Sequence, residues 1–155
     1  MIVKLDHIGI VPPSIDEARS ILEGKLGLIL DEKRAPLPDG SYFAPEGTHN
    51  YFIQVGVGET QIEILIPVVP ETGTYKYLQR FGPGLHHLGY AVDDVPATAR
   101  ELAETGLSQI DLGDPDPDRL TAAFFHPDRF AGGVYFAGVN WYEPTPTQDG
   151  RFLPA

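Results

Sequence analysis

The sequence contains no cysteine. Disulfides, thiolate nucleophiles and zinc–thiolate sites are therefore excluded, and any bound metal must use His, carboxylate, amide or water ligands. Basic residues are also few, with 11 Lys and Arg against 22 Asp and Glu and a net charge of −11. Nucleic acids and anionic membrane surfaces are bound largely through Lys and Arg, so we expect neither as a partner.

Long apolar runs are absent as well. No run approaches the roughly 18 apolar residues of a membrane span, and the first seven residues have neither the basic region nor the apolar region of a secretory signal peptide. We therefore expect a cytoplasmic protein. Its 155 residues, 42% of them hydrophobic, suit one domain with a real core, and 17 Gly and 15 Pro indicate many turns.

The opening strand and helix of the chain recur in its second half. Residues 5–11 (LDHIGIV) and 85–91 (LHHLGYA) share Leu, His and Gly at equivalent positions. Each segment is followed by a helix N-cap residue, Ser14 or Asp94, and later by a glycine suited to a left-handed helix end. Strand-like runs then follow at 50–55 and 61–66 in the first half, and at 120–125 and 133–139 in the second. The pattern predicts an internal repeat.

Each half therefore predicts the order β-α-β-β-β. Two such units can join their sheets into an open cup, so we expect one α+β domain over 1–155. It would have an open, curved, mixed β-sheet with helices outside. The predicted parts are repeat one at about 3–67 with a strand near 28–35 and a loop at 37–49, a short helix at 74–81, repeat two at about 84–141 with a strand near 107–112, and an irregular Pro-rich tail at 142–155.

Three polar residues stand where the repeat predicts buried strand. His7 and His87 are equivalent positions of the two halves, and Glu63 lies between isoleucines in QIEILI. A buried imidazole needs a hydrogen bond or a metal, and a buried carboxylate needs a cation, a partner or water. Two His and one carboxylate suit a divalent transition metal with open positions. Structural, hydrogen-bonded side chains are the alternative interpretation.

The segments DHIGI at 6–10 and SIDEA at 14–18 resemble the vicinal oxygen chelate superfamily, the glyoxalase, bleomycin resistance and dioxygenase group. The methylmalonyl-CoA epimerase branch is the most similar. That similarity is carried by QIEILIP at 61–67, GPGLHHLG at 82–89 with VDDV at 92–95, and His126-Pro127 before GGV at 132–134. The resemblance extends from about 4 to 139. It implies a metal that is held by both halves and chelates adjacent oxygens of a substrate.

Carried onto this sequence, the resemblance implies that His7, Glu63 and His87 bind Mn, Co, Fe, Ni or Zn. Two positions depart from the family pattern. Ala137 stands where a fourth ligand, a Glu, is expected, and Asn50 aligns with a Glu thought to serve as a base in the epimerases. Alanine cannot coordinate a metal, and an asparagine amide cannot accept a proton at neutral pH. Both replacements argue against a straightforward epimerase.

Two functions follow as alternatives. The first is a metal-dependent isomerase-like, epimerase-like or lyase-like enzyme acting on a small carbonyl or acyl-thioester compound, with the metal as Lewis acid. Its candidate proton-transfer groups are Glu63 (if it is not a ligand), His49, Tyr135 and Tyr90. The second is a metal-free protein that sequesters a small molecule, as bleomycin-resistance-type relatives do. Retention of the three ligands favours the enzyme, whereas Ala137 suits the binding protein.

Other polar residues have weaker interpretations. The cations Lys33, Arg34, Lys76 and Arg80 could contact the phosphates of a CoA substrate or simply be exposed, and a net charge of −11 does not favour steering of a polyanion. His86 alternates with His87 and is predicted on the opposite face, and His126 is predicted in a surface turn. Cups of this type often form dimers, so we expect a homodimer.

Overall fold

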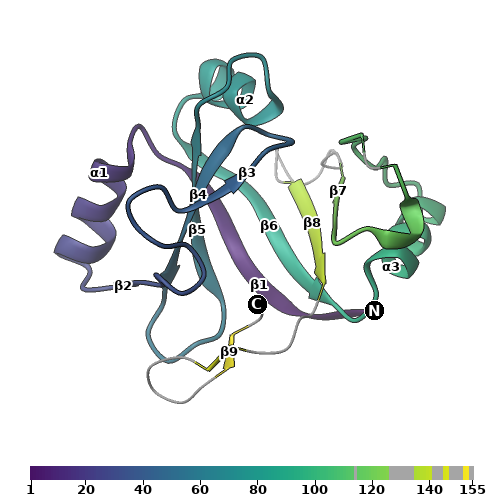
Figure 1. The fold of residues 1–155 in the computed structure, drawn as a ribbon, viewed down its shortest axis with the longest axis horizontal. Helices are drawn as coiled ribbons and strands as arrows, with labels where there is room; N and C mark the ends of the chain where they lie inside the picture. The colour runs from purple at the N-terminus through teal and green to yellow at the C-terminus, as the bar shows by residue number, and fades with distance from the viewer. Residues whose placement is uncertain (114, 126–134, 141–144, 147–151, 154–155) are drawn as a thin grey trace. The chain divides into compact units, whose positions relative to one another are not determined.

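The computed structural model of the chain describes residues 1–113, 115–125, 135–140, 145–146 and 152–153. The chain divides into two compact units, one formed by Met1–His7 with His87–Ala155 and the other by Ile8–His86. Strands β1 (Ile2–Val11) and β6 (Gly84–Val92) cross the boundary, so each contributes residues to both units (Figure 1).

The unit Ile8–His86 is built on an antiparallel pair of strands, β4 (Thr48–Gln54) and β5 (Gln61–Pro67). Their register runs from Thr48 opposite Pro67 to Gln54 opposite Gln61, and the short strands β2 and β3 both pair with β4. The remaining elements are α1 (Ile15–Arg19), which continues into the π-helix η1 (Ser20–Lys25), β2 (Ile29–Leu30), β3 (Ser41–Phe43) and α2 (Gly73–Phe81).

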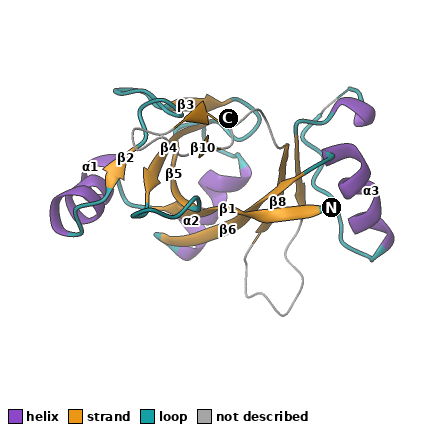
Figure 2. Cartoon of the chain, turned by 90° about the horizontal axis from the view of Figure 1, so that it is seen from below, coloured by secondary structure: helices purple, strands orange, loops and turns teal. Residues whose placement is uncertain are grey.

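The other unit combines β6 with β8 (Tyr135–Asn140), which runs parallel to it, and with β7 (Ala122–Phe125), which is antiparallel to β8. Its helices are α3 (Val95–Glu104) and the short 3-10 turn η2 (Pro117–Arg119), and β9 (Thr145–Pro146) pairs with β10 (Phe152–Leu153). Along the described residues the main sheet has the order β2-β4-β5-β1-β6-β8-β7 and is mixed. Figure 2 draws the strands in orange and the helices in purple. The α+β prediction with a mixed sheet is confirmed.

Capping side chains set both helix starts that the repeat predicts. The Ser14 side chain accepts from the Glu17 N–H at 3.1 Å, and the Asp94 carboxylate accepts from the Ala97 N–H at 2.8 Å. Each satisfies a backbone donor that the first helical turn leaves without a partner. Glycines follow both helices at positive φ, Gly27 at 67° and Gly106 at 96°, where a residue with a Cβ would be strained.

Each unit has its own hydrophobic core between a helix and strands. In Ile8–His86, alternate residues of β4 and β5 pack against the α1–η1 helix; this core consists of Ala18, Leu22, Leu30, Tyr51, Ile53 and Ile64. The second core lies around α3 and β7 and consists of Val92, Val95, Ala99, Leu120, Ala123 and Phe125. Among the described residues no helix combines the length and hydrophobicity that crossing a bilayer requires.

Two predicted strands are shorter than expected because Asp carboxylates accept hydrogen bonds from nearby backbone N–H groups and form turns. The strand expected at 28–35 is limited to β2, since Asp31 Oδ1 accepts the N–H groups of Lys33 and Arg34 and turns the chain. The strand expected at 107–112 is reduced to an isolated bridge between Gln109 and Phe125, and Asp111 accepts the N–H of Gly113 in a similar turn.

Pairing also occurs where the sequence indicated loop. β3 forms inside the 37–49 loop by pairing with β4, and β9 and β10 form in the tail that was expected to be irregular. The linker helix expected at 74–81 is confirmed as α2.

Truncating the first core should lower stability markedly. Ile64 is fully buried, so Ile64→Ala removes packed methylene groups and leaves a cavity. We expect the free energy of unfolding in urea to fall by about 2 to 5 kcal/mol. Val57→Ala, at a residue 80% exposed, is the control and should change it by no more than about 0.5 kcal/mol. Equal effects of the two variants would contradict this core assignment.

Candidate functional site

The structure brings His7 of β1 and His87 of β6 together within the unit Met1–His7 with His87–Ala155. Both side chains are buried, and their Nε2 atoms lie 2.9 Å apart. The two rings are nearly perpendicular, at 88°. Two repeat-equivalent imidazoles thus direct the same nitrogen toward one point.

Asp6 determines which nitrogen of His7 is available. Its carboxylate is fully buried, and Oδ2 lies 2.8 Å from His7 Nδ1. A carboxylate accepts, so Nδ1–H of His7 donates and the Nε2 of a neutral His7 ring carries a lone pair. The same carboxylate–histidine arrangement stands behind many metal-binding histidines. This role of Asp6 was not predicted from the sequence, although a carboxylate directly before a candidate ligand was a usable signal.

Gly89 provides the room that the His7 ring occupies. It is buried on β6, two residues after His87, and a Cβ at this position would overlap the His7 imidazole. Glycine in a strand interior often marks such a close approach. The recurrence of Gly in the two opening strands thus has a structural reason, at least in the second copy.

Glu63 lies on a polar face of the other unit. Asn50 Nδ2 donates to Glu63 Oε1 at 2.9 Å, and Phe52 is the direct cross-strand partner of Glu63. Strand alternation puts Asn50, Phe52 and Glu63 on one face, opposite the core residues Tyr51 and Ile64. Asn50, where a Glu base was expected, therefore orients the Glu63 carboxylate.

This β4–β5 face also presents buried polar atoms. Thr48 Oγ1 and Asn50 Oδ1 are inaccessible to solvent and have no hydrogen-bond partner among the residues that the structure describes. A buried polar group without a partner costs about 1 to 3 kcal/mol. The face is thus suited to a polar ligand or to water.

His49 takes the opposite face of β4 and does not approach Glu63. Its Nδ1–H donates to the Asp39 carbonyl at 2.7 Å, and its ring lies beside Tyr42 with centroids 5.1 Å apart. The neighbouring Tyr51 hydroxyl donates to the Pro38 carbonyl at 2.7 Å, and burial raises the pKa of Tyr51. Both hydrogen bonds thus hold the loop that precedes β3 against strand β4.

The remaining candidates lie on β6 and β8. In the parallel register Tyr135 is opposite His87, and Ala137 is opposite Gly89. The side chains of β8 and all of His126 lie outside the described part of the chain, so the role of Tyr135 stays a prediction. Tyr90 is three residues from His87 and therefore on the other face of β6, so its choice as a proton-transfer candidate beside His87 was wrong.

His86 lies where alternation predicts, on the face of β6 opposite His87. Its ring contacts the Tyr77 ring edge to face, with centroids 4.8 Å apart. Burial raises the pKa of Tyr77, whose hydroxyl donates to the Leu85 carbonyl.

The chain is similar in sequence to a known family and to two named proteins. The family model described as Glyoxalase/Bleomycin resistance protein/Dioxygenase superfamily matches residues 6–125. The Ethylmalonyl-CoA/methylmalonyl-CoA epimerase of Cereibacter sphaeroides is 28% identical over 135 residues, which cover 85% of this chain and 94% of that protein. An uncharacterized protein of Bacillus subtilis, YqjC, is 26% identical over 111 residues, which cover 70% of this chain and 71% of that protein.

Solved structures agree with this similarity. The hypothetical protein BH1468 from Bacillus halodurans matches with a TM-score of 0.72 and 30% identity, covering 93% of this chain and 98% of that chain. Methylmalonyl-CoA epimerase from Mycobacterium tuberculosis matches with a TM-score of 0.72 and 26% identity, covering 90% of this chain and 88% of that chain.

A methyl group at Gly89 should disturb the imidazole pair. Gly89→Ala would force the His7 ring to move, and we expect overpacking to lower the free energy of unfolding by about 1 to 3 kcal/mol in urea denaturation. Gly84→Ala lies on the same strand with open space around its Cβ and serves as the control, with a change within about 0.5 kcal/mol. A Gly89→Ala protein as stable as the control would show that His7 does not pack on this glycine.

Proposed function

Since the chain belongs to the Glyoxalase/Bleomycin resistance protein/Dioxygenase superfamily, we propose that it is a metal-dependent isomerase-like or epimerase-like enzyme. Its substrate would be a small carbonyl or acyl-thioester compound. The observation that carries this proposal is the pair of buried imidazoles with facing Nε2 atoms and a carboxylate behind one of them. The similarity to the epimerases of C. sphaeroides and M. tuberculosis supports the acyl-thioester class.

His7, His87 and Glu63 would hold a divalent transition metal such as Mn, Co, Fe, Ni or Zn. All three side chains are buried, and imidazole nitrogen with carboxylate oxygen is a donor set that such ions accept. The spacing of the histidines fits. Nitrogen ligands lie about 2.0 to 2.1 Å from such an ion, so two ligands of one ion cannot be more than about 4.2 Å apart, and the two Nε2 atoms, 2.9 Å apart, meet this limit.

A bound ion of this kind supplies a Lewis acid for a carbonyl or enolate oxygen, which makes a neighbouring C–H more acidic. The residues of the chain would prepare this chemistry. Asp6 keeps the proton of His7 on Nδ1 and its Nε2 available as a donor of electrons. Asn50 orients the Glu63 carboxylate through Oε1. Asn50 cannot itself accept a proton, so Glu63, if it is not a ligand, and Tyr135 are the candidate proton-transfer groups.

One observation favours a second function, metal-free sequestration of a small molecule. Ala137, for which the resemblance implies a ligand position, lies opposite Gly89 in the register of β6 and β8. Its side chain has no donor atom, so a metal here would have one protein ligand fewer. Metal analysis separates the two functions.

Metal binding should depend on His87. We expect the purified protein, reconstituted in turn with Mn, Co, Fe, Ni and Zn, to retain close to one equivalent of at least one metal by mass spectrometry. His87→Ala should weaken that binding by at least about 10-fold, since loss of even an outer-shell partner costs 10- to 100-fold. His86→Ala is the matched control, because it changes the neighbouring histidine on the other face. Protein that stays metal-free after reconstitution would favour the binding protein.

Proton exchange should reveal the reaction. Candidate acyl-CoA thioesters, methylmalonyl-CoA among them, incubated with the protein in D2O should gain deuterium at the carbon next to the thioester carbonyl. Glu63→Gln removes the carboxylate while keeping the shape of the side chain, and we expect about 100-fold slower exchange. His86→Ala should exchange at the wild-type rate. No enzyme-dependent labelling across a broad panel of acyl-CoA thioesters would exclude the epimerase-like reaction.

A further inference from the structure

Among the residues that the structure describes, the side-chain amide of Asn50 is paired at only one of its two ends. Its Nδ2 donates to Glu63 Oε1 at 2.9 Å, and this bond identifies the nitrogen, because an ionised carboxylate can only accept. Asn50 Oδ1 has no hydrogen-bond partner in that part of the chain, although only 9% of Asn50 is exposed. A rotation of the amide would break the bond to Glu63, so Oδ1 is an acceptor of fixed direction.

Gln61 shows that a buried amide on the same face can be paired at both ends. Its Oε1 accepts from Arg34 Nη1 at 2.7 Å, and its Nε2 donates to Asp31 Oδ2 at 2.9 Å. A buried acceptor that makes no hydrogen bond lowers the stability of the folded chain. The unpaired end of Asn50 is therefore more readily explained by a bound partner than by folding.

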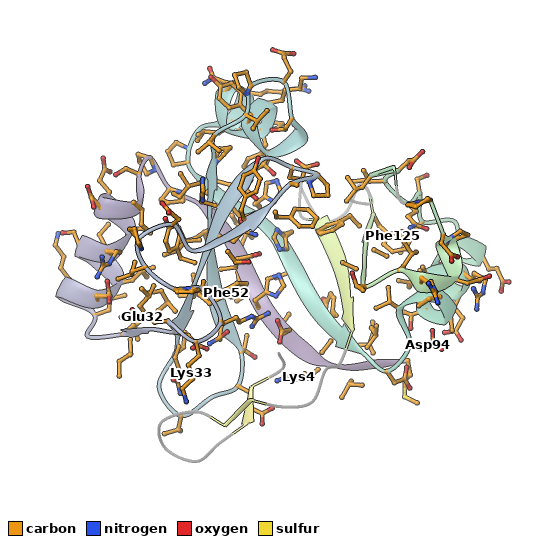
Figure 3. All side chains as sticks on the ribbon, viewed as in Figure 1. Lys4, Glu32, Lys33, Phe52, Asp94 and Phe125 are labelled. Atoms are coloured by element: carbon orange, nitrogen blue, oxygen red, sulfur yellow. The ribbon has the colours of Figure 1, made fainter. Side chains whose placement is uncertain are left out.

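The surroundings of Asn50 contain another acceptor and an apolar ring. Glu63 presents its carboxylate, and Phe52, which Figure 3 labels, is the direct cross-strand partner of Glu63. The Arg34 guanidinium carbon is 3.8 Å from the centroid of the Phe52 ring, a cation–π distance that stabilises the position of the ring. A hydrogen-bond donor suits an acceptor in these surroundings, whereas a second acceptor would leave both groups without a partner.

We infer that Asn50 Oδ1 accepts a hydrogen bond from a hydroxyl group of the substrate, so that the substrate is a hydroxylated acyl or carbonyl compound. A hydroxyl supplies the O–H donor that Oδ1 requires, and it is less costly to bury than a charged ammonium group. The acyl group of a methylmalonyl thioester offers only acceptors at neutral pH and would not pair with Oδ1. The inference rests on the proposed function for its reacting carbonyl, and on the Asn50 contacts for its hydroxyl.

Replacement of a ligand hydroxyl by a methyl group isolates this hydrogen bond. The two groups are similar in size, and the methyl group is the more apolar, so burial alone favours the methyl ligand. A site built to pair a hydroxyl has the opposite preference, because the methyl ligand leaves the buried acceptor unpaired. The sign of the preference therefore distinguishes a hydroxyl site from an apolar one.

The test measures binding of two ligand pairs to the purified full chain by calorimetry. One pair is lactoyl-CoA and isobutyryl-CoA, and the other is 3-hydroxybutyryl-CoA and 3-methylbutyryl-CoA, with both enantiomers of each hydroxyacyl group. Within a pair a methyl group replaces the hydroxyl, and the charge and the CoA are the same. We expect wild-type protein to bind the hydroxylated member at least about 10-fold more tightly in one pair. Equal binding or a preference for the methyl member in both pairs, or no binding of any of these ligands, would overturn the inference.

The variants assign the preference to one residue. Asn50→Leu should abolish it by weakening binding of the hydroxylated member alone, whereas a merely structural role of Asn50 would weaken both members. Gln54→Leu is the matched control, because it removes an amide from the same face of β4 that already donates to the Gly56 carbonyl, and its preference should equal that of wild type. If Asn50→Leu does not fold by circular dichroism, Asn50→Ala decides. An unreduced preference in the Asn50 variant, or an equal loss in Gln54→Leu, contradicts the inference.

Failure of the proposed reaction is distinguishable from failure of this inference. An Asn50-dependent preference for hydroxylated ligands without proton exchange would support the hydroxyl site and exclude the reaction. Proton exchange in a protein that binds the hydroxylated and methyl members equally would do the reverse.

Discussion

Two buried imidazoles that face each other through the same nitrogen constrain the chemistry of this protein. Asp6 holds the proton of His7 on Nδ1, so the Nε2 of a neutral His7 ring can only accept. His87 must then donate from its own Nε2, because two facing lone pairs in a buried site would repel each other. A divalent ion would replace that one proton and bind both lone pairs. Gly89 is part of the same constraint, since a side chain there would occupy the volume of the His7 ring.

The two faces of the β4–β5 pair have different roles: one forms the apolar core, and the other carries the polar groups. Tyr51, Ile53 and Ile64 face the α1–η1 helix and form the apolar core. The other face is also buried, yet it carries Asn50, Glu63 and other polar groups. Buried polar groups lower stability unless they are paired, so the polar composition of this face is more readily explained by binding than by folding. The Arg34 guanidinium over Phe52 belongs to this second face.

The resemblance to the epimerases implies a Glu where this chain has Asn50, and proton transfer in the proposed enzyme would then depend on other groups. Asn50 is neutral, and its amide donates to the carboxylate that the chain keeps at Glu63. By donating a hydrogen bond, the Asn50 amide holds the Glu63 carboxylate in place as a proton acceptor or a metal ligand. A carboxylate at position 50 would instead repel the Glu63 carboxylate. The proposed enzyme would therefore depend on Glu63 for proton transfer or for metal binding.

Local patterns were sufficient to predict both helix caps, the β4 and β5 strands, and the choice of His7 and His87 as a candidate pair. Capping needs only neighbouring residues, and alternation has a period of two, so both are recorded in short stretches of sequence. Alternation from Asn50 was also sufficient to predict that His49 lies on the other face of β4, contrary to its choice as a proton-transfer candidate. Other features depended on contacts between distant segments. The overlap of His7 with Gly89, the position of Arg34 over Phe52, and the bridge that replaces the expected strand at 107–112 each join parts of the chain that only folding brings together, and no local spacing encodes such a contact.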